Sequence, residues 1–127
     1  MQHHTLIVDD NRLNHFILDF LLRNSKSEIQ PISFYNGFEV IEKLKQSDDP
    51  QEKFLIFLDI NMPVIDGWQV LEFIEESDLL ENISVIILTS EVTPQIKDRA
   101  FSYNSVINFV EKPINKDKIK ELIDCEH

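Results

Sequence analysis

Short apolar runs alternate with helical patterns along this chain, and this alternation limits the possible folds more than any other feature of the sequence. The longest unbroken apolar run, Phe-Leu-Ile-Phe-Leu at residues 54–58, is typical of a strand that is covered on both faces, as in parallel sheets. Weaker apolar runs predict further strands at residues 6–8, 32–34, 83–88 and 106–110.

Each predicted strand is followed by a segment with the spacing of an amphipathic helix. The first of these segments has its apolar stripe, in the i, i+3, i+4, i+7, i+8 pattern, at Leu13, Phe16, Ile17, Phe20 and Leu21. The later helices have candidate N-caps at Asn36, Asp66, Thr93 and Asn115. Strict alternation of strand and helix predicts an α/β fold, with a doubly wound parallel sheet between two layers of helices.

Length and composition exclude several classes of function. The 127 residues fit one domain, and 12 basic against 23 acidic residues give a formal charge of −11. This charge repels polyanions, so nucleic acid and anionic membrane surfaces are poor partners. The two glycines cannot supply either common nucleotide-binding loop, and the single cysteine excludes a disulfide framework. Without a long apolar run or a secretory pattern, we expect no membrane insertion and a cytoplasmic location.

Polar side chains follow four of the predicted strands, at the edge where doubly wound sheets bind their ligands. They are Asp9 and Asp10 after the first strand, Asp59 after the third, Thr89 and Ser90 after the fourth, and Lys112 after the fifth. Three close carboxylates without His or Cys favour a hard cation such as Mg²⁺. A cation, an ammonium group and a hydroxyl suit a phosphoryl group, and a carboxylate there can act as its nucleophile. The four histidines have no metal-ligand spacing, and we expect them to be solvated or partly packed.

Four motifs at these strand ends resemble those of the receiver domains of two-component response regulators. They are Val-Asp-Asp-Asn at 8–11, Leu-Asp-Ile-Asn-Met-Pro-Val-Ile-Asp-Gly at 58–67, Leu-Thr-Ser at 88–90 and Phe-Val-Glu-Lys-Pro at 109–113. They occur in the order found in the family, and the resemblance covers essentially the whole chain. It implies a flavodoxin-like (βα)5 three-layer sandwich with parallel strands in the order 2-1-3-4-5. It also implies a single receiver domain over residues 1–127, with no output domain.

The resemblance implies a metal site and a phosphoacceptor. Asp59 matches the carboxylate that receives a phosphoryl group from a phosphohistidine donor. Asp10 matches a direct Mg²⁺ ligand, and Asp9 matches the acid that supports the metal, commonly through water. Asn61 matches the position whose backbone carbonyl also binds the metal, and Asp59 itself completes the metal set.

The resemblance also implies a conformational switch. Thr89 matches the hydroxyl that moves onto the phosphoryl oxygens. Phe109 matches an aromatic residue that then rotates inward, although the family more often has tyrosine there, and we expect Phe109 to be buried whether or not it moves. Lys112 matches the lysine that pairs with the phosphoryl group, and the Lys112–Pro113 bond is expected to be cis. Asn61 and Glu91 match positions that tune the lifetime of the phosphoryl group, and we expect a transient phosphorylated state.

The expected partners are a sensor histidine kinase or histidine phosphotransfer protein and a downstream protein target. The target would read the surface formed by the fourth helix, fifth strand and fifth helix, including residues 91–102 and 115–125. The chain is thus expected to be a switch that catalyses only its own phosphotransfer and dephosphorylation, not an enzyme. Three alternatives remain: a relay shuttle to a second histidine, a Mg²⁺-dependent phosphohydrolase with Asp59 as nucleophile, and a binding module that is never phosphorylated.

Overall fold

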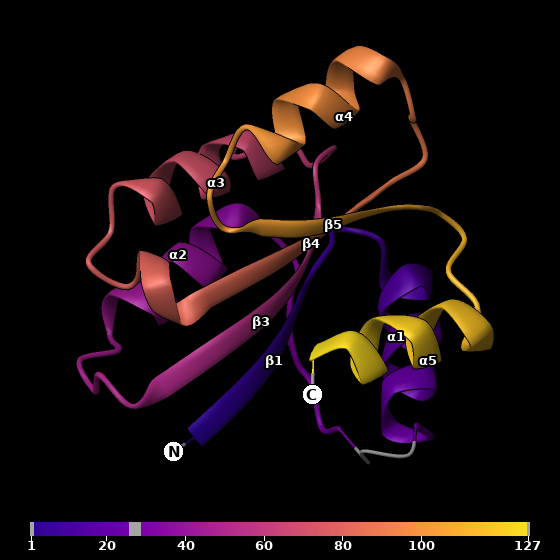
Figure 1. The fold of residues 1–127 in the computed structure, drawn as a ribbon, viewed down its shortest axis with the longest axis horizontal. Helices are drawn as coiled ribbons and strands as arrows, with labels where there is room; N and C mark the ends of the chain where they lie inside the picture. The colour runs from indigo at the N-terminus through magenta and orange to yellow at the C-terminus, as the bar shows by residue number, and fades with distance from the viewer. Residues whose placement is uncertain (1, 26–28, 127) are drawn as a thin grey trace.

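A computed structural model describes residues 2–25 and 29–126 of the chain. Five parallel strands form one sheet in the order β2-β1-β3-β4-β5 (Figure 1). The predicted alternation and strand order are therefore confirmed. A short 3₁₀ helix that the sequence patterns did not predict, Leu80–Asn82, precedes β4. The strands are β1 (Gln2–Val8), β2 (Ile32–Phe34), β3 (Glu52–Asp59), β4 (Ile83–Thr89) and β5 (Val106–Glu111), and the helices are α1 (Arg12–Arg23), α2 (Gly37–Lys45), α3 (Gly67–Glu75), α4 (Pro94–Phe101) and α5 (Lys116–Glu126).

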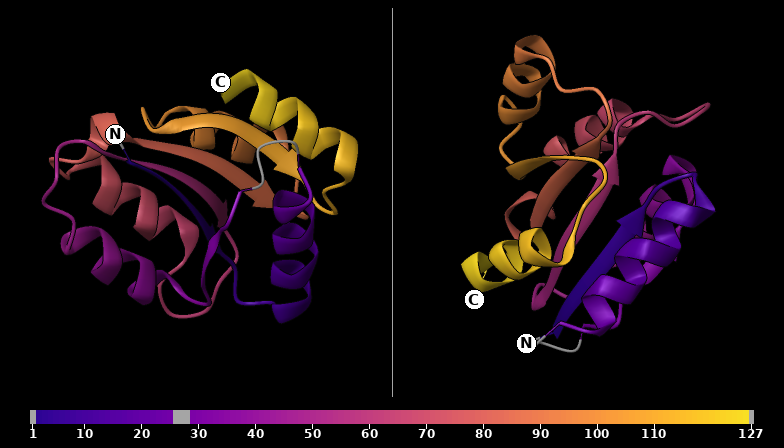
Figure 2. Two further views of the ribbon diagram at one scale, coloured as in Figure 1. Left: turned by 90° about the horizontal axis from the view of Figure 1, so that it is seen from below. Right: turned by 90° about the vertical axis from the view of Figure 1, so that its right-hand side faces the viewer.

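The helices cover both faces of the sheet, as a doubly wound fold requires. Helices α1 and α5 lie on one face, and α2, α3 and α4 lie on the other (Figures 1 and 2). Each face has its own buried apolar cluster, because successive side chains of a strand point to opposite faces. In β3, for example, Ile56 and Leu58 pack under α2 and α3, whereas Phe57 packs under α1 and α5. The result is a three-layer sandwich of the flavodoxin type.

Side-chain caps fix the helix starts close to the carboxyl edge of the sheet. The four predicted caps are confirmed: each side-chain oxygen accepts a backbone N–H three residues further on, at Asn36, Asp66, Thr93 and Asn115. Asn11 caps α1 in the same way, accepting from the N–H groups of Leu13 and Asn14. Since these caps satisfy N–H groups that have no intrahelical partner, they define where each loop from a strand ends.

The orientation of α1 differs from the prediction. Leu13, Phe16 and Phe20 are 65%, 70% and 56% exposed, so most of the predicted apolar stripe faces outward. The residues buried in α1 are instead His15, Leu18 and Leu22. Both sets fit helical spacing, and periodicity alone cannot distinguish them. In the described part of the chain, no helix is long and apolar enough to span a membrane.

Candidate functional site

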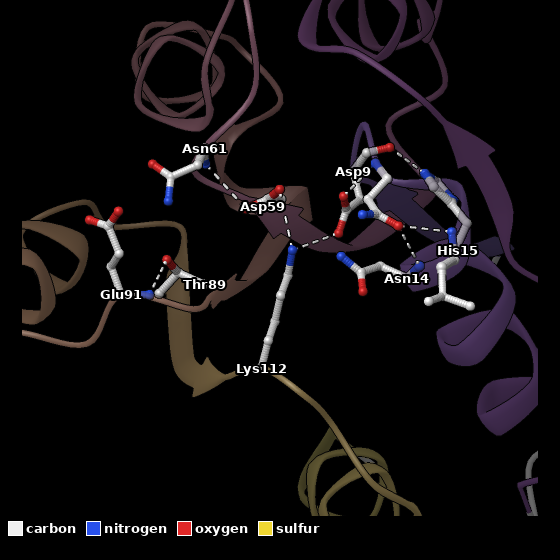
Figure 3. A network of polar contacts seen from close by, with 10 residues as sticks. Asp9, Asn14, His15, Asp59, Asn61, Thr89, Glu91 and Lys112 are labelled. Atoms are coloured by element: carbon white, nitrogen blue, oxygen red, sulfur yellow. Dashed lines mark hydrogen bonds and ion pairs between the residues drawn. The ribbon is translucent and has the colours of Figure 1, made fainter.

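The polar side chains predicted at the strand ends meet at one edge of the sheet. The ammonium group of Lys112, which follows β5, lies between two carboxylates from β1 and β3 (Figure 3). Its Nζ is 2.8 Å from Oδ2 of Asp9 and 3.3 Å from Oδ2 of Asp59. The Lys112 backbone N–H donates to the Thr89 carbonyl at 2.9 Å, so the end of β5 is also tied to the end of β4. The parallel topology thus brings together residues that are 103 positions apart in the chain.

Three acids at this edge form a compact oxygen cluster. Asp9, Asp10 and Asp59 each offer a carboxylate oxygen, and these oxygens lie within 4.8 Å of one another. Asp9 and Asp59 are only 2% and 5% exposed, whereas Asp10 is exposed. Carboxylate oxygens are the ligands that a hard divalent cation prefers, and several close like charges need a counter-charge beyond one lysine. The donor set therefore fits Mg²⁺, with Asp10 on the solvent side and Asp9 and Asp59 below it.

Burial dominates the acid–base behaviour of Asp59. Loss of solvent raises the pKa of its carboxyl group from 3.8 to about 6; Lys112 lowers the pKa and the negative charge of Asp9 raises it. A backbone N–H from Asn61 also favours the charged form. At neutral pH the group is ionised in most molecules, and burial makes this charge costly. A cation at this position would remove part of that cost.

Three of the site side chains are held by turns of the same type, one at the end of each strand. Asp9 Oδ1 accepts from the N–H of Asn11 at 2.9 Å, and Asp59 Oδ1 accepts from the N–H of Asn61 at 3.1 Å. Thr89 Oγ1 accepts from the N–H of Glu91 at 3.1 Å. In each case a short polar side chain bonds to the backbone two residues on, which stabilises a turn directly after a strand. The sequence favours these turns because Asp and Thr stand at the three strand ends.

The backbone of α3 begins directly behind Asp59. The N–H of Gly67 donates to the Ile60 carbonyl at 2.9 Å. A Cβ atom at Gly67 would lie 2.6 Å from the Ile60 Cα and 2.7 Å from the Asp59 carbonyl oxygen. Only glycine permits this close approach, which fixes the loop that carries Asn61. In the same loop, Val64 has a φ of 68° and is 96% exposed.

Of the two residues expected to switch, Thr89 ends β4, which pairs with the strand that carries Asp59. Thr89 is buried with its hydroxyl in the turn toward Glu91, as Figure 3 shows. Phe109, expected to be buried, is only half-buried, because it lies on β5 at the edge of the sheet. Its ring packs against the cluster under α2, α3 and α4. The Lys112–Pro113 peptide bond is cis. Asn61 and Glu91 are exposed, so their side chains are accessible from solvent.

Two features beside the site were not identified from the sequence. Contrary to the expectation of a solvated or partly packed ring, His15 is 3% exposed and hydrogen-bonds to the Asp9 carbonyl. Of the other histidines, His3 is exposed and His4 is half-buried, while His127 lies outside the described residues. Near the start of α3, the Arg99 guanidinium lies 4.1 Å from the centre of the Trp68 ring, which stacks on Tyr103 at 6.1 Å. No sequence motif marks either contact.

Comparison with known proteins agrees with this geometry. The model of the response regulator receiver domain family matches residues 5–124. The chain is 30% identical over 128 residues to the two-component response regulator ARR6 of Arabidopsis thaliana, covering 95% of this chain and 67% of that protein. It is 34% identical over 121 residues to hybrid signal transduction histidine kinase L of Dictyostelium discoideum, covering 93% of this chain but only 7% of that protein. The solved structure of the chemotaxis protein CheY4 of Vibrio cholerae shares the fold, with a TM-score of 0.79, 18% identity and 98% of both chains covered.

A doubly wound parallel sheet with acids, a hydroxyl and a lysine at its carboxyl edge is the arrangement of a receiver domain. The chain belongs to the receiver domain family of two-component response regulators. Members of this family bind Mg²⁺ at an acidic cluster and interact with histidine kinases or phosphotransfer proteins. They are generally not enzymes in the usual sense.

Proposed function

We propose that Asp59 accepts a phosphoryl group from a phosphohistidine of a sensor kinase or phosphotransfer protein, and that this changes the surface formed by α4, β5 and α5. The observation that supports the proposal most directly is the position of Lys112, whose ammonium group lies between the carboxylates of Asp9 and Asp59. A cation held there by other parts of the site can neutralise phosphoryl oxygens at the moment when negative charge accumulates on them.

In the proposed transfer, a carboxylate oxygen of Asp59 attacks the phosphorus atom of the donor. The new O–P bond forms as the P–N bond of the phosphohistidine breaks, and the electron pair of that bond leaves with the imidazole. Asp59 must be ionised to attack, and a pKa of about 6 leaves most of it ionised at neutral pH. Asn61 holds one carboxylate oxygen through its N–H, which restricts the direction of attack.

Mg²⁺ is the cofactor that the acids fit, and Asp10, Asp59 and the Asn61 carbonyl are the proposed ligands, with Asp9 supporting the site. When bound, the ion supplies positive charge that lowers the cost of bringing a phosphoryl group to three carboxylates. Lys112 lies 2.8 Å from Oδ2 of Asp9, so its ammonium group adds a second positive charge beside the proposed ligands.

The proposed switch starts at Thr89. Its hydroxyl now accepts a hydrogen bond from the turn toward α4, and a phosphoryl group on Asp59 would offer strong acceptor oxygens next to it. Movement of Thr89 toward these oxygens would draw the β4–α4 loop with it, and Phe109 would fill the space behind. The phosphoryl group would thereby shift an existing equilibrium through contacts available in only one state.

Mass spectrometry of the intact protein with Mg²⁺ and a small acyl phosphate tests the proposal. We expect one added phosphoryl group on the wild type and none on Asp59→Asn. A matched control is Glu72→Gln, which removes a negative charge at an exposed position of α3 and should leave phosphorylation unchanged. An unmodified wild type, with both the small donor and a phosphorylated histidine kinase or phosphotransfer protein, would refute the mechanism.

The two roles of such a switch differ in the fate of the phosphoryl group. A relay shuttle would pass it from Asp59 to a second histidine phosphotransfer protein, whereas an effector would keep it and bind a target more tightly or weakly. Incubating phosphorylated protein with a phosphotransfer protein and measuring the phosphate on each distinguishes these roles. The half-exposed Phe101 and Ile107 on the α4–β5 side give a target an apolar surface, so we favour the effector.

A further inference from the structure

Every hydrogen-bonding atom of Asp9 has a partner in the structure. Its N–H donates to the Phe34 carbonyl at 3.1 Å, its Oδ1 accepts from the N–H of Asn11, and its Oδ2 accepts from Lys112. Its carbonyl oxygen accepts from Nε2 of His15 at 2.5 Å. Three of these partners come from the backbone or from the site already described. The fourth, His15, has no place in the proposed mechanism.

The His15 ring is buried and packed against neighbouring side chains. It is 3% exposed, and because a carbonyl only accepts, Nε2 must carry the proton in this hydrogen bond. The ring packs against Tyr35 with centroids 4.2 Å apart, and the Arg12 guanidinium lies 4.6 Å from the Tyr35 ring centre. Its other nitrogen, Nδ1, has no hydrogen-bond partner among the described residues. Among the described residues, the hydrogen bond to the Asp9 carbonyl is thus the one polar contact of the buried His15 side chain.

The atom that His15 holds is well placed to orient both acids. The carbonyl oxygen of Asp9 belongs to the planar peptide group that joins Asp9 to Asp10, so fixing it fixes the rotation of that plane. The direction in which the exposed Asp10 side chain leaves the backbone depends on this plane. The turn that presents Asp9 Oδ1 to Asn11 depends on it as well. Groups that orient metal ligands in this indirect way affect metal affinity strongly in many sites.

We propose that His15 is a positioning residue of the metal site, which donates from Nε2 to the Asp9 carbonyl and so holds the Asp9–Asp10 peptide in the orientation that Mg²⁺ binding needs. This inference rests on the proposed function, since it assigns a role in the same site. Tyr35, whose own ring is covered by Arg12, packs against the His15 ring, and the buried Leu18 and Leu22 hold the same helix against the sheet. His15 itself does not touch the metal or the phosphoryl group.

Two substitutions of His15 separate the hydrogen bond from the packing. His15→Phe keeps a ring against Tyr35 but removes the donor, and His15→Gln places an amide N–H near the position of Nε2. Leu22→Ala is the matched control, because it removes buried packing from the same helix without touching Asp9. Mg²⁺ binding to each unphosphorylated variant is measured by titration calorimetry, and folding is checked by circular dichroism. His15→Leu replaces His15→Phe if the larger ring prevents folding.

We expect Mg²⁺ affinity to fall by about tenfold in His15→Phe and to be largely retained in His15→Gln and Leu22→Ala. In the metal-free protein, the amide proton of Asn11 should exchange faster in His15→Phe than in His15→Gln, since the turn at Asp9 loosens. Wild-type affinity in the Phe or Leu variant would overturn the inference and leave the proposed function intact. An equal loss in Leu22→Ala would also overturn it, because general destabilisation would then be sufficient. A wild type that binds no Mg²⁺ would overturn both.

Discussion

Replacing Asp59 with Asn should make the metal-free protein more stable at neutral pH, although it removes the proposed phosphoacceptor. The carboxylate is 5% exposed, and burial raises its pKa to about 6 despite the nearby Lys112. Keeping Asp59 charged therefore costs more free energy in the folded protein than in the unfolded chain. Asn has nearly the same shape and can still accept the hydrogen bond from the N–H of Asn61. It carries no charge to bury.

The sign and size of the effect are set by the two pKa values. Between pH 3.8 and about 6, the folded state keeps a proton that the unfolded chain has lost. The stability associated with Asp59 is thus fully present below pH 3.8 and is lost as the pH rises to about 6. A gap of about two pKa units corresponds to about 3 kcal/mol at roughly 1.36 kcal/mol each. Because Asn must bury an amide NH₂ group beside the Lys112 ammonium, we expect a net gain of about 1–2 kcal/mol.

Urea unfolding in the presence of a chelator measures this gain directly. The free energy of unfolding of the wild type and of Asp59→Asn is compared from about pH 5 to about pH 8. The advantage of the variant should grow by about 1 kcal/mol over this range and level off above pH ~7, once Asp59 is fully ionised in the wild type. Glu72→Gln, at an exposed position, should change stability by less than about 0.5 kcal/mol at every pH.

Two outcomes would refute the reasoning. If Asp59→Asn were no more stable than the wild type near neutral pH, the ionised carboxylate would not be costly in the folded state. If the gain were the same at every pH, it would come from packing or from the unfolded chain and not from charge. Adding Mg²⁺ should then narrow the difference between the two proteins, because only the wild type keeps all three carboxylates.

Three further substitutions test other parts of the structure. Gly67→Ala should destabilise the protein by about 2 kcal/mol or more, because its Cβ would lie 2.6 Å from the Ile60 Cα; urea unfolding measures this, and an unchanged midpoint would contradict the close packing. Val64→Gly should stabilise by about 0.5–1 kcal/mol, because a β-branched residue at a φ of 68° is strained; a lower melting temperature would contradict this. Glu75→Ala should cost about 1–2 kcal/mol, because the carboxylate accepts from the N–H groups of Asn104 and Ser105; thermal unfolding checks it, with Glu76→Ala as an exposed control.

The fold could be predicted from the sequence because its signals are local and repeated. The continuous apolar run at residues 54–58 lies inside β3, and the caps at Asp66 and Asn115 stand where α3 and α5 begin. The convergence of Asp9, Asp59 and Lys112 is then a result of parallel topology alone, since the carboxyl ends of parallel strands share an edge.

The features that could not be predicted depend on contacts between segments. The rotation of α1 about its axis depends on which of two apolar arcs packs better against the sheet, and spacing is the same for both. His15 is buried because its ring can both hydrogen-bond to the Asp9 carbonyl and pack against Tyr35, a residue 20 positions away. Phe109 is less buried than expected because β5 lies at the edge of the sheet.

The sheet separates the interior into two apolar cores, so the two helices of the proposed binding surface are packed independently of each other. Helix α4 is anchored in the core that contains Ala100, and α5 in the core that contains Ile119, on opposite faces of the sheet. A partner that binds both α4 and α5 across the edge of β5 would therefore contact two helices whose packing is independent. Mutations in different layers have few shared neighbours and should combine additively. Substitutions in the layer of one helix could then adapt the surface to a new partner, while the other helix keeps its contacts with the original partner.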